Sequence, residues 1–295
     1  MRRQRSDSMG VKARAFKQFL FHRPLIASLH LTSRCNLRCK HCPDAVTEFR
    51  QPDLNTLRWM EIMKSLKERG VIGLIIWGGE PMMRLDIEQI MAYANKHFIT
   101  TFHTNGIQDF SNIKANAIFV SLDGDKEVND SIRGEGTFDK IIDNIQKYPN
   151  KRRIVIGYTF HQMNRYKVSY ACNLANELGV RIGFQSYYTE KAEDPLKLSD
   201  EDREKCYREI RFMKMCIRPS YPILNSHANL TSMIKGGHKC HRWAYISIDS
   251  SGKEHQKCLP NVNCEHCNLM CFNEINLALS LKRDAIGTVR YTFRS

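Results

Sequence analysis

Hydrophobic and polar positions in the middle of the chain form short apolar runs that alternate with segments of helical periodicity. The apolar runs, which predict strands, cover residues 25–32, 71–77, 98–103, 117–121, 153–160 and 180–184. The periodic segments, which predict helices, cover residues 53–69, 86–97, 138–148 and 166–178. Asp53 is the expected N-cap of the first helix, and Gly70 its expected stop. This alternation predicts an α/β fold whose parallel sheet is open or curled into a partial barrel.

Four motifs with unusual residues follow consecutive predicted strands. CNLRCKHC, residues 35–42, follows the first strand, and GGEP, residues 78–81, follows the second. TNG, residues 104–106, follows the third strand, and SLDG, residues 121–124, closes the fourth. Ligands of parallel sheets bind beyond the carboxyl ends of the strands. We therefore expect these four loops to meet on one face and to carry the chemistry.

Composition narrows the role of the cysteines. The chain has 295 residues, 42% of them hydrophobic, which is enough for one large domain and a small appended one. No apolar run reaches the roughly 18 residues of a membrane span, and the N-terminus lacks a signal-peptide core. A cytoplasmic location is therefore predicted. Eleven cysteines in that reducing compartment indicate metal ligands or reactive thiols rather than disulfides.

The formal net charge of +14 favours an anionic partner. Lys and Arg are spread along the chain without a nucleic-acid-binding motif, so nucleic acid is not expected to be that partner. Residues 1–24 are the most basic segment, and their apolar side chains form one helical stripe: Val11, Ala15, Phe16, Phe19 and Leu20. This segment is expected either to cover one end of a barrel or to rest on an anionic lipid surface, at the inner membrane face.

The three clustered thiols, Cys35, Cys39 and Cys42, allow two kinds of metal centre. They can bind zinc if a fourth ligand such as His41 completes the site. They can also hold three irons of a [4Fe-4S] cluster and leave the fourth iron open. With GGEP after the next strand and SLDGDKEVNDSIRGEGTFDKIIDNI further on, residues 25–190 resemble the radical S-adenosylmethionine (SAM) enzymes, whose fold is a partial (β/α)6 TIM-like barrel.

The resemblance implies roles for individual residues. Cys35, Cys39 and Cys42 would ligate a cluster whose open iron chelates the methionine part of SAM. The remaining cofactor-binding positions that it implies are Gly78, Gly79, Glu80, Asn105, Ser121, Asp123 and Arg133. The glycines allow close backbone approach, the Glu80 carboxylate accepts from the methionine ammonium, and the Arg133 guanidinium pairs with the methionine carboxylate. Ser121 and Asp123 would bind the ribose hydroxyls.

Structural alternatives remain for several of these residues. Glu80 has the alternative of a solvated loop carboxylate, and Arg133 that of a structural salt bridge. Asn105 and Asp123 have the alternative of ordinary turn chemistry. The residue before the third cysteine is often aromatic in the family, and here it is His41, which can also pack flat over a cluster edge.

A second set of cysteines lies near the end of the chain. Cys240 precedes an expected hairpin that turns at Ser251 and Gly252, and the remaining four thiols of the set are Cys258, Cys264, Cys267 and Cys271. A zinc site is one interpretation. The pattern also resembles the twitch and SPASM extensions of radical SAM enzymes, which implies one or two auxiliary iron–sulfur clusters. Two fully bound clusters would need eight ligands and only five thiols are present, so a single [4Fe-4S] cluster is expected. Its expected ligands are Cys240, Cys258, Cys264 and Cys267, with Cys271 as either a substitute or a spare. Three further cysteines are predicted to be structural: Cys172, Cys206 and Cys216.

The predicted organisation has four parts: residues 1–24, the barrel 25–190, a helical connector 191–235 and a cysteine-rich extension 236–295. The C-terminal pattern resembles that of adenosylhopane synthase, which implies a lipid substrate. The expected substrate is therefore a small molecule or a lipid. The alternative is that the enzyme modifies a peptide or a tetrapyrrole. Residues on or beyond late strands are candidates to line its cavity: Tyr158, His161, Gln185, Tyr187 and Tyr188. A flavodoxin- or ferredoxin-type protein is the expected electron donor.

An interpretation of a different class is a non-catalytic protein that binds zinc or nucleic acid. It would account for the charge and the cysteines, but it gives no role to GGEP.

Overall fold

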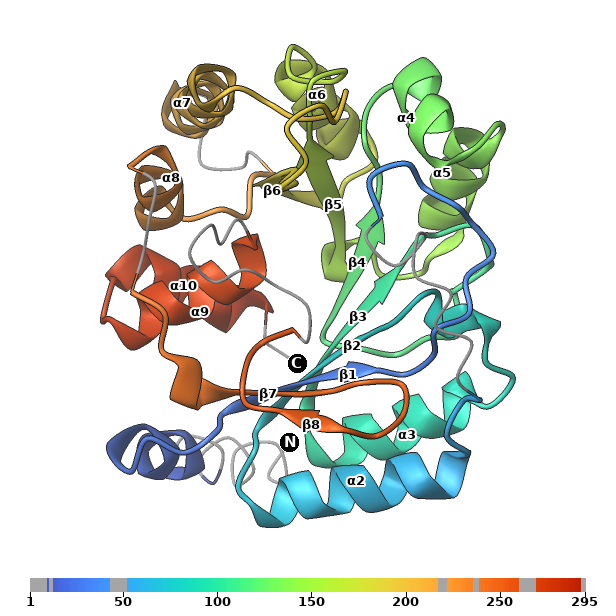
Figure 1. Ribbon diagram of the computed structural model, residues 1–295, viewed down its shortest axis with the longest axis vertical. Helices are drawn as coiled ribbons and strands as arrows, with labels where there is room; N and C mark the ends of the chain where they lie inside the picture. The colour runs from blue at the N-terminus through green and yellow to red at the C-terminus, as the bar shows by residue number, and fades with distance from the viewer. Residues whose placement is uncertain are drawn as a thin grey trace.

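The computed structural model describes residues 10, 13–42, 52–216, 222–235, 239–259 and 269–292. Within them, one sheet has the strand order β6-β5-β4-β3-β2-β1-β7-β8. The strands are β1 Ile26–His30, β2 Gly73–Trp77, β3 Ile99–Thr104, β4 Ala117–Ser121, β5 Ile154–Phe160, β6 Arg181–Ser186, β7 Tyr245–Ile248 and β8 Glu254–His255. β1 to β6 pair in parallel, β7 pairs in parallel with β1, and β8 is antiparallel to β7. The predicted α/β fold with an open parallel sheet is therefore confirmed (Figure 1).

Helices lie on both sides of this curved sheet (Figure 1). The α-helices are α2 Thr56–Glu68, α3 Ile87–His97, α4 Lys126–Arg133, α5 Thr137–Lys147, α6 Val168–Glu177, α7 Asp200–Cys216, α8 His227–Ile234, α9 Met270–Leu279 and α10 Arg283–Thr292. Short 3-10 turns cover η2 Pro81–Met83, η3 Lys151–Arg153 and η4 Arg242–Ala244. Residues 13–20 are also helical. In the described part of the chain, no helix is long and apolar enough to cross a bilayer.

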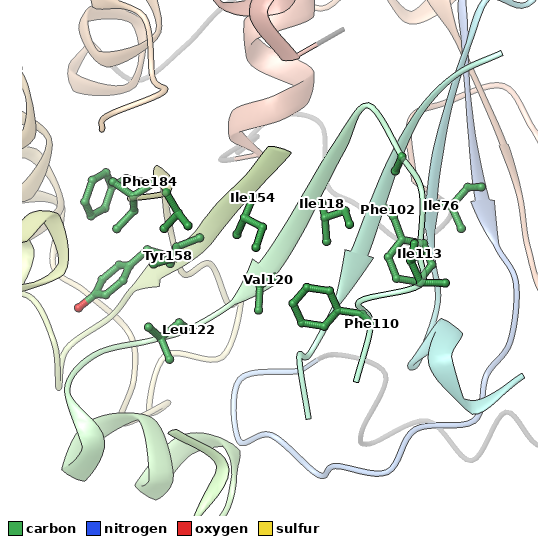
Figure 2. Packing of buried hydrophobic residues seen from close by; sticks show 14 of the residues in the cluster. Ile76, Phe102, Phe110, Ile113, Ile118, Val120, Leu122, Ile154, Tyr158 and Phe184 are labelled. Atoms are coloured by element: carbon green, nitrogen blue, oxygen red, sulfur yellow. The ribbon is translucent and has the colours of Figure 1, made fainter. Parts of the chain in front are cut away.

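The main hydrophobic core fills the outer face of the sheet. Ile76, Phe102, Ile118 and Ile154 stand opposite one another on neighbouring strands, and Figure 2 shows them in a row on one face. Apolar side chains from α2, α3, α5 and α6, such as Trp59, complete this core. Because side chains alternate along a strand, the residues between these positions face the inner side of the sheet, where α9 and α10 pack (Figure 1).

The structure corrects two local predictions. The N-cap of α2 is Asn55, whose side chain accepts a hydrogen bond from the Arg58 backbone N–H, and not Asp53. Asp53 instead accepts hydrogen bonds of 2.9 and 2.7 Å from the Arg34 guanidinium, which ties it to the cysteine loop. The sequence analysis also missed α4, which has Asp125 as its N-cap and Gly134 as its C-cap. The expected hairpin is present as β7 and β8, whereas the proposed domain boundaries remain a prediction.

Candidate functional site

The cysteine loop after β1 lies directly against the GGEP loop after β2. The Gly79 N–H donates to the Thr32 carbonyl at 2.7 Å, and the Glu80 N–H donates to the Arg34 carbonyl at 2.8 Å. A Cβ atom at Gly79 would stand 2.3 Å from the Arg34 oxygen, and one at Gly78 would stand 2.7 Å from the Thr32 oxygen. Both glycines are therefore needed for the contact between these loops, a close approach that the sequence assigned to the cofactor.

Glu80 joins the second loop to the third. Its carboxylate is fully buried and accepts hydrogen bonds from the Met82 N–H at 2.9 Å, the Thr104 hydroxyl at 2.9 Å and the Asn105 N–H at 2.6 Å. Burial raises its pKa, and these hydrogen bonds oppose that rise. Glu80 is thus an internal crosslink between loops and not a solvated carboxylate.

The three N-terminal cysteines lie beside hydrogen-bond donors and a cation. The Asn105 amide nitrogen is 3.9 Å from the Cys35 sulfur and also donates to the Asn36 side chain at 2.7 Å. An Arg133 guanidinium nitrogen is 3.9 Å from the Cys39 sulfur. Burial raises the pKa of the Cys35 thiol, and it raises that of Cys39 to about 11. Without a bound cation these thiols are protonated, so a metal centre would have to stabilise the thiolates.

Asp123 and Arg133 form a buried ion pair at the end of β4. Their closest oxygen and nitrogen are 2.8 Å apart, and the Nε2 atom of His41 is 3.3 Å from the same Asp123 oxygen. Burial alone would raise the pKa of Asp123, but Arg133 and His41 beside it hold that pKa below its usual range. The backbone N–H of Thr159 also donates to Asp123 at 3.3 Å. His41 therefore connects the cysteine loop to the SLDG loop.

The predicted cofactor residues thus come together at the carboxyl ends of β1 to β4. Ser121 is the last residue of β4 and stands beside Gly157 of β5. Arg133 Nε and His41 Nδ1 are buried without a hydrogen-bond partner among the described residues. Within the same residues, no group of three or more His, Cys, Asp or Glu side chains is arranged to hold a single metal ion. Three adjacent thiols, a neighbouring guanidinium and unused buried donors fit an anionic iron–sulfur cluster with a polar ligand beside it.

The inner face of the sheet carries two rows of polar side chains below these loops. In the lower row, Ser247, Ser28 and Thr101 lie on β7, β1 and β3, with Ile75 between the last two. Their three hydroxyl groups are buried without a hydrogen-bond partner in the described part of the structure. Unpartnered buried hydroxyls are rare and costly, so this row marks the inner face as unusually polar.

The upper row is aromatic and lies just before the GGEP and TNG motifs. Trp77 stacks on His30 with ring centroids 4.7 Å apart, and His103 stacks on Phe119 with centroids 4.6 Å apart. Trp77 Nε1 and His103 Nε2 have no hydrogen-bond partner among the residues described. Burial lowers the pKa of His103 to about 4, so its ring is neutral at neutral pH. The sequence analysis missed both rows, although period-two alternation along the strands was the available signal.

The residues expected to line a substrate cavity separate into two groups. Tyr158 faces the outer core, where its ring centroid is 5.4 Å from that of Phe184 (Figure 2). His161 and Tyr187 lie near the site, with ring centroids 6.3 and 6.2 Å from that of His41. Gln185 donates to the Thr159 hydroxyl at 3.2 Å on the inner face. Tyr188, at 38% exposure, lies at the surface.

Three of the five C-terminal cysteines meet in one apolar cluster. Cys258 is buried among Tyr245, Phe272 and neighbouring side chains, and Cys240 and Cys271 pack against the same cluster. Cys264 and Cys267 lie outside the described residues. Two of the cysteines predicted to be structural are buried in the main core: Cys172 and Cys206. Burial raises the pKa of each of these two thiols to about 12. The side chain of Cys216 is outside the described set.

Comparison with protein families places the site in a known context. Residues 29–164 match the family described as the Radical SAM superfamily. The mycofactocin maturase MftC of Mycolicibacterium smegmatis is 32% identical over 136 residues, which are 43% of this chain and 35% of that protein. The Fe-coproporphyrin III synthase of Methanosarcina barkeri is 27% identical over 158 residues, which are 50% of this chain and 40% of that protein. The chain thus spans well under half of the length of these relatives.

Solved structures share the fold over most of the chain. Streptococcus suis SuiB bound to S-adenosylmethionine superposes with a TM-score of 0.66 at 17% identity, covering 91% of this chain and 68% of that one. The structure of anSMEcpe with bound AdoMet has a TM-score of 0.65 at 17% identity, covering 92% of this chain and 84% of that one. At this identity the likeness establishes the fold alone.

Proposed function

We propose, on the premise that residues 29–164 form a radical SAM domain and that the protein is an enzyme, that it cleaves SAM reductively to modify a polar substrate. The observation that carries the proposal is the convergence of the cysteine, GGEP, TNG and SLDG loops at the carboxyl ends of four adjacent strands. Glu80, Asn105 and Arg133 connect these loops by direct contacts.

The cluster would be held by Cys35, Cys39 and Cys42. When bound, it supplies the electron that splits SAM into methionine and a 5'-deoxyadenosyl radical. The Asn105 amide and the Arg133 guanidinium, each 3.9 Å from a cysteine sulfur, favour the thiolate form of these ligands. The side chain of Cys39 is buried, so water has little access to that part of the site.

SAM would be oriented by the surrounding loops. Arg133 Nε has no hydrogen-bond partner among the described residues, so the guanidinium has a donor left for the methionine carboxylate. The Oε2 atom of Glu80 accepts a hydrogen bond from the Asn105 N–H and has acceptor capacity left for the methionine ammonium, together with the backbone carbonyls of Gly78 and Gly79. Ser121, at the end of β4, is the residue we assign to the ribose. Asp123 acts mainly by fixing Arg133 and His41.

An auxiliary [4Fe-4S] cluster would occupy the C-terminal cysteine set. The meeting of Cys240, Cys258 and Cys271 in one apolar cluster supports this assignment. Cys264 and Cys267 would supply the remaining ligands, so that four of the five thiols bind and one is spare. A flavodoxin- or ferredoxin-type donor would provide the electrons.

The inner face supports a substrate that forms hydrogen bonds. Ser28, Thr101 and Ser247 offer hydroxyls, and Trp77 and His103 offer ring nitrogens, all buried and without a partner in the described structure. A purely apolar lipid would leave these groups unsatisfied, at a cost of about 1–3 kcal/mol each. The polar inner face therefore favours a peptide segment or a cofactor precursor over the lipid that the C-terminal pattern implied. The relatives named as maturases and as a porphyrin synthase point the same way.

The N-terminal helix supports peripheral contact with an anionic lipid surface. Phe16 and Leu20 of this helix are 68% and 59% exposed, as is Phe21 directly after it at 58%, and Arg14 and Lys17 also lie in the helix. The opposite side is attached to the protein, since the Gln18 amide donates to the Pro24 and Arg69 carbonyls. Part of the helix thus covers the protein and part presents apolar and basic groups outward, as in an interfacial helix.

The test is iron and acid-labile sulfide per chain after anaerobic reconstitution, with 5'-deoxyadenosine formation from SAM and dithionite measured on the same samples. We expect about eight irons in the wild type and about four when Cys35, Cys39 and Cys42 are all changed to Ala. Deoxyadenosine should be lost in that variant. Cys172→Ala, a change at a buried core thiol, is the matched control and should keep all iron. Zinc without iron in the wild type would contradict the proposal.

A further inference from the structure

A basic groove lies at the amino end of the sheet, away from the site described above. It has a volume of about 460 Å³ and is lined by residues from β6, α7, α10 and the segment before α8: Arg181, Lys214, Ile223, Leu224, Asp284, Gly287, Thr288, Arg290 and Tyr291. Arg181 is the first residue of β6, whereas the cysteine and GGEP loops follow the last residues of β1 and β2. The groove is therefore separate from the predicted SAM site, and its size suits a small-molecule ligand.

Three cations face this groove without an ion-pair partner among the described residues: Arg181, Lys214 and Arg290. The Arg181 guanidinium lies 3.3 Å above the centre of the Tyr291 ring, which holds its plane in place. The Lys214 ammonium donates one hydrogen bond, to the Ile223 carbonyl at 2.8 Å. Burial lowers the pKa of Lys214, as expected for an ammonium that lacks a close counter-ion.

The acidic groups near the groove do not neutralise it. Asp284 uses its two carboxylate oxygens on the backbone N–H groups of Ala228, at 2.8 Å, and Ala285, at 3.0 Å. Glu274 lies behind the groove, is 2% exposed and accepts from the Ser226 N–H at 2.7 Å. Burial raises the pKa of Glu274 to about 8, so it is mostly protonated at neutral pH. Three positive charges thus oppose one exposed negative charge, which favours a dianion.

The groove adjoins a small apolar pocket between the inner face of the sheet and α9 and α10. Leu224 and Thr288 line both spaces. The pocket has a volume of about 30 Å³ and is otherwise lined mainly by apolar side chains, such as Phe119, Met270 and Ile275. The two spaces therefore share part of their walls, and the pocket has room for an apolar group of about methyl size.

We propose that this groove is a second ligand site that binds a phosphate monoester, with the phosphate between Arg181, Lys214 and Arg290 and a short apolar substituent directed to the adjoining pocket. Guanidinium groups bind phosphate through paired hydrogen bonds, and an ammonium adds a point charge. A phosphate, with a charge near −2, matches the groove better than a carboxylate. The proposal does not depend on the SAM chemistry, because the groove and the SAM-binding loops use different residues; the adjoining pocket shares Thr101 and Phe119 with the inner face of the sheet.

The test is isothermal titration calorimetry on the reconstituted full chain without SAM, with n-propyl phosphate, inorganic phosphate and n-propanol as separate titrants. We expect n-propyl phosphate to bind with one site per chain and several-fold more tightly than inorganic phosphate, because its alkyl carbons leave water. n-Propanol alone should not bind measurably. Lys214→Gln and Arg290→Gln should each weaken phosphate binding by roughly tenfold.

Two further variants keep the test specific to the groove. A Cβ atom at Gly287 would meet no atom within 4 Å, so Gly287→Leu should fold normally and block the groove. Lys140→Gln, at an exposed position on α5, is the charge-matched control and should leave binding unchanged.

Several results would overturn the proposal. Absence of saturable phosphate binding, or equal losses in Lys140→Gln and Arg290→Gln, would leave only non-specific attraction to a basic surface. Equal affinities for propyl and inorganic phosphate would remove the apolar pocket from the site. Tighter binding of a polyglutamate peptide than of propyl phosphate would make the groove a contact for an acidic protein.

Discussion

The two cysteine regions of this chain lie in contrasting surroundings. Cys35 and Cys39 sit among polar partners, with the Asn105 amide and the Arg133 guanidinium each 3.9 Å from a sulfur. Cys240 and Cys258 instead belong to an apolar cluster, and the Asn276 amide lies 3.8 Å from the Cys240 sulfur. A cluster in the first region could exchange a charged ligand, whereas one in the second would lie against apolar side chains, which suits electron transfer.

This contrast teaches that thiol count alone does not define a site. The polar region is held together by contacts between loops from four strands, so its geometry depends on tight backbone packing. The apolar region depends on side-chain packing against β7 and α9. Substitutions should therefore affect the two regions in different ways.

Substitution of the C-terminal cysteines should give the largest difference between the two cysteine regions. Changing Cys240, Cys258 and Cys271 to Ala should remove about four irons per chain. Deoxyadenosine formation from SAM and dithionite should persist, because the first cysteine set is intact. Iron analysis and deoxyadenosine quantification on one preparation measure both quantities. If iron stays unchanged, the C-terminal set binds no iron–sulfur cluster.

A single methyl group at Gly79 should disrupt the polar region. The new Cβ atom would stand 2.3 Å from the Arg34 oxygen and would push the GGEP and cysteine loops apart. Because misplacement of about 1 Å costs roughly 100-fold in rate, we expect Gly79→Ala to lower deoxyadenosine formation by at least about that factor. Gly287→Ala, where a Cβ meets no atom within 4 Å, is the control. Normal activity in Gly79→Ala would show that the loop contact is dispensable.

Arg133 should affect both SAM binding and stability. Arg133→Gln leaves the buried Asp123 carboxylate without its main partner, which should cost about 3 kcal/mol of unfolding free energy. It should also weaken SAM binding by roughly tenfold, because a charge-assisted hydrogen bond is lost.

The double variant Asp123→Asn with Arg133→Gln separates these two effects. Its unfolding free energy, measured by urea denaturation, should return toward the wild-type value. Its SAM affinity, measured by equilibrium dialysis, should stay as low as that of Arg133→Gln alone. Recovery of both quantities would make Arg133 a purely structural partner of Asp123.

Glu274 should make stability depend on pH. Burial raises its folded pKa from 4.5 to about 8, so the folded state keeps a proton that the unfolded carboxyl releases. The contribution of this proton to the unfolding free energy is complete below the pKa of the unfolded carboxyl. It is lost as pH rises toward the folded pKa, which lowers the unfolding free energy by on the order of 3 kcal/mol. Between about pH 5 and about pH 8, the unfolding free energy of the Glu274→Gln variant should therefore fall less than that of the wild type in urea denaturation. Parallel pH curves for the two proteins would contradict this.

The smallest effect should come from the N-terminal helix. Replacing Phe16, Leu20 and Phe21 by Gln should lower binding to anionic vesicles several-fold in co-sedimentation, without changing deoxyadenosine formation. Leu57 and Phe212, also highly exposed, provide the control when both are changed to Gln. Equal losses in the two variants would exclude a specific contact through the helix.

Most strands of the open sheet could be predicted from local sequence, because buried parallel strands are continuous apolar runs. The limits of β4, residues 117–121, were predicted without error, and those of β1 and β3 within two residues. The short helix α4 was missed because its eight residues are mostly polar. The N-cap of α2 was misplaced because Asp53 and Asn55 are equally good caps, and the ion pair with Arg34 decides between them.

The site was less accessible to sequence reasoning than the fold. The motifs mark which loops matter, but the role of Gly79 depends on the oxygen of Arg34, which only the folded chain brings near. Likewise, the two rows of side chains on the inner face can be predicted only when the register between strands is known, such as Ser28 opposite Ser247. Pairing between distant segments is not encoded in local periodicity.

The pairing of β1 with β7 also bears on how the chain is made. Ile26 aligns with Tyr245, so one edge of β1 stays unpaired while the ribosome synthesises the segment between them. Exposed strand edges can pair with other chains, and distant pairings form slowly. Nascent chains should therefore be prone to aggregation until β7 has emerged, and chaperones that shield β1 should raise the yield of native protein.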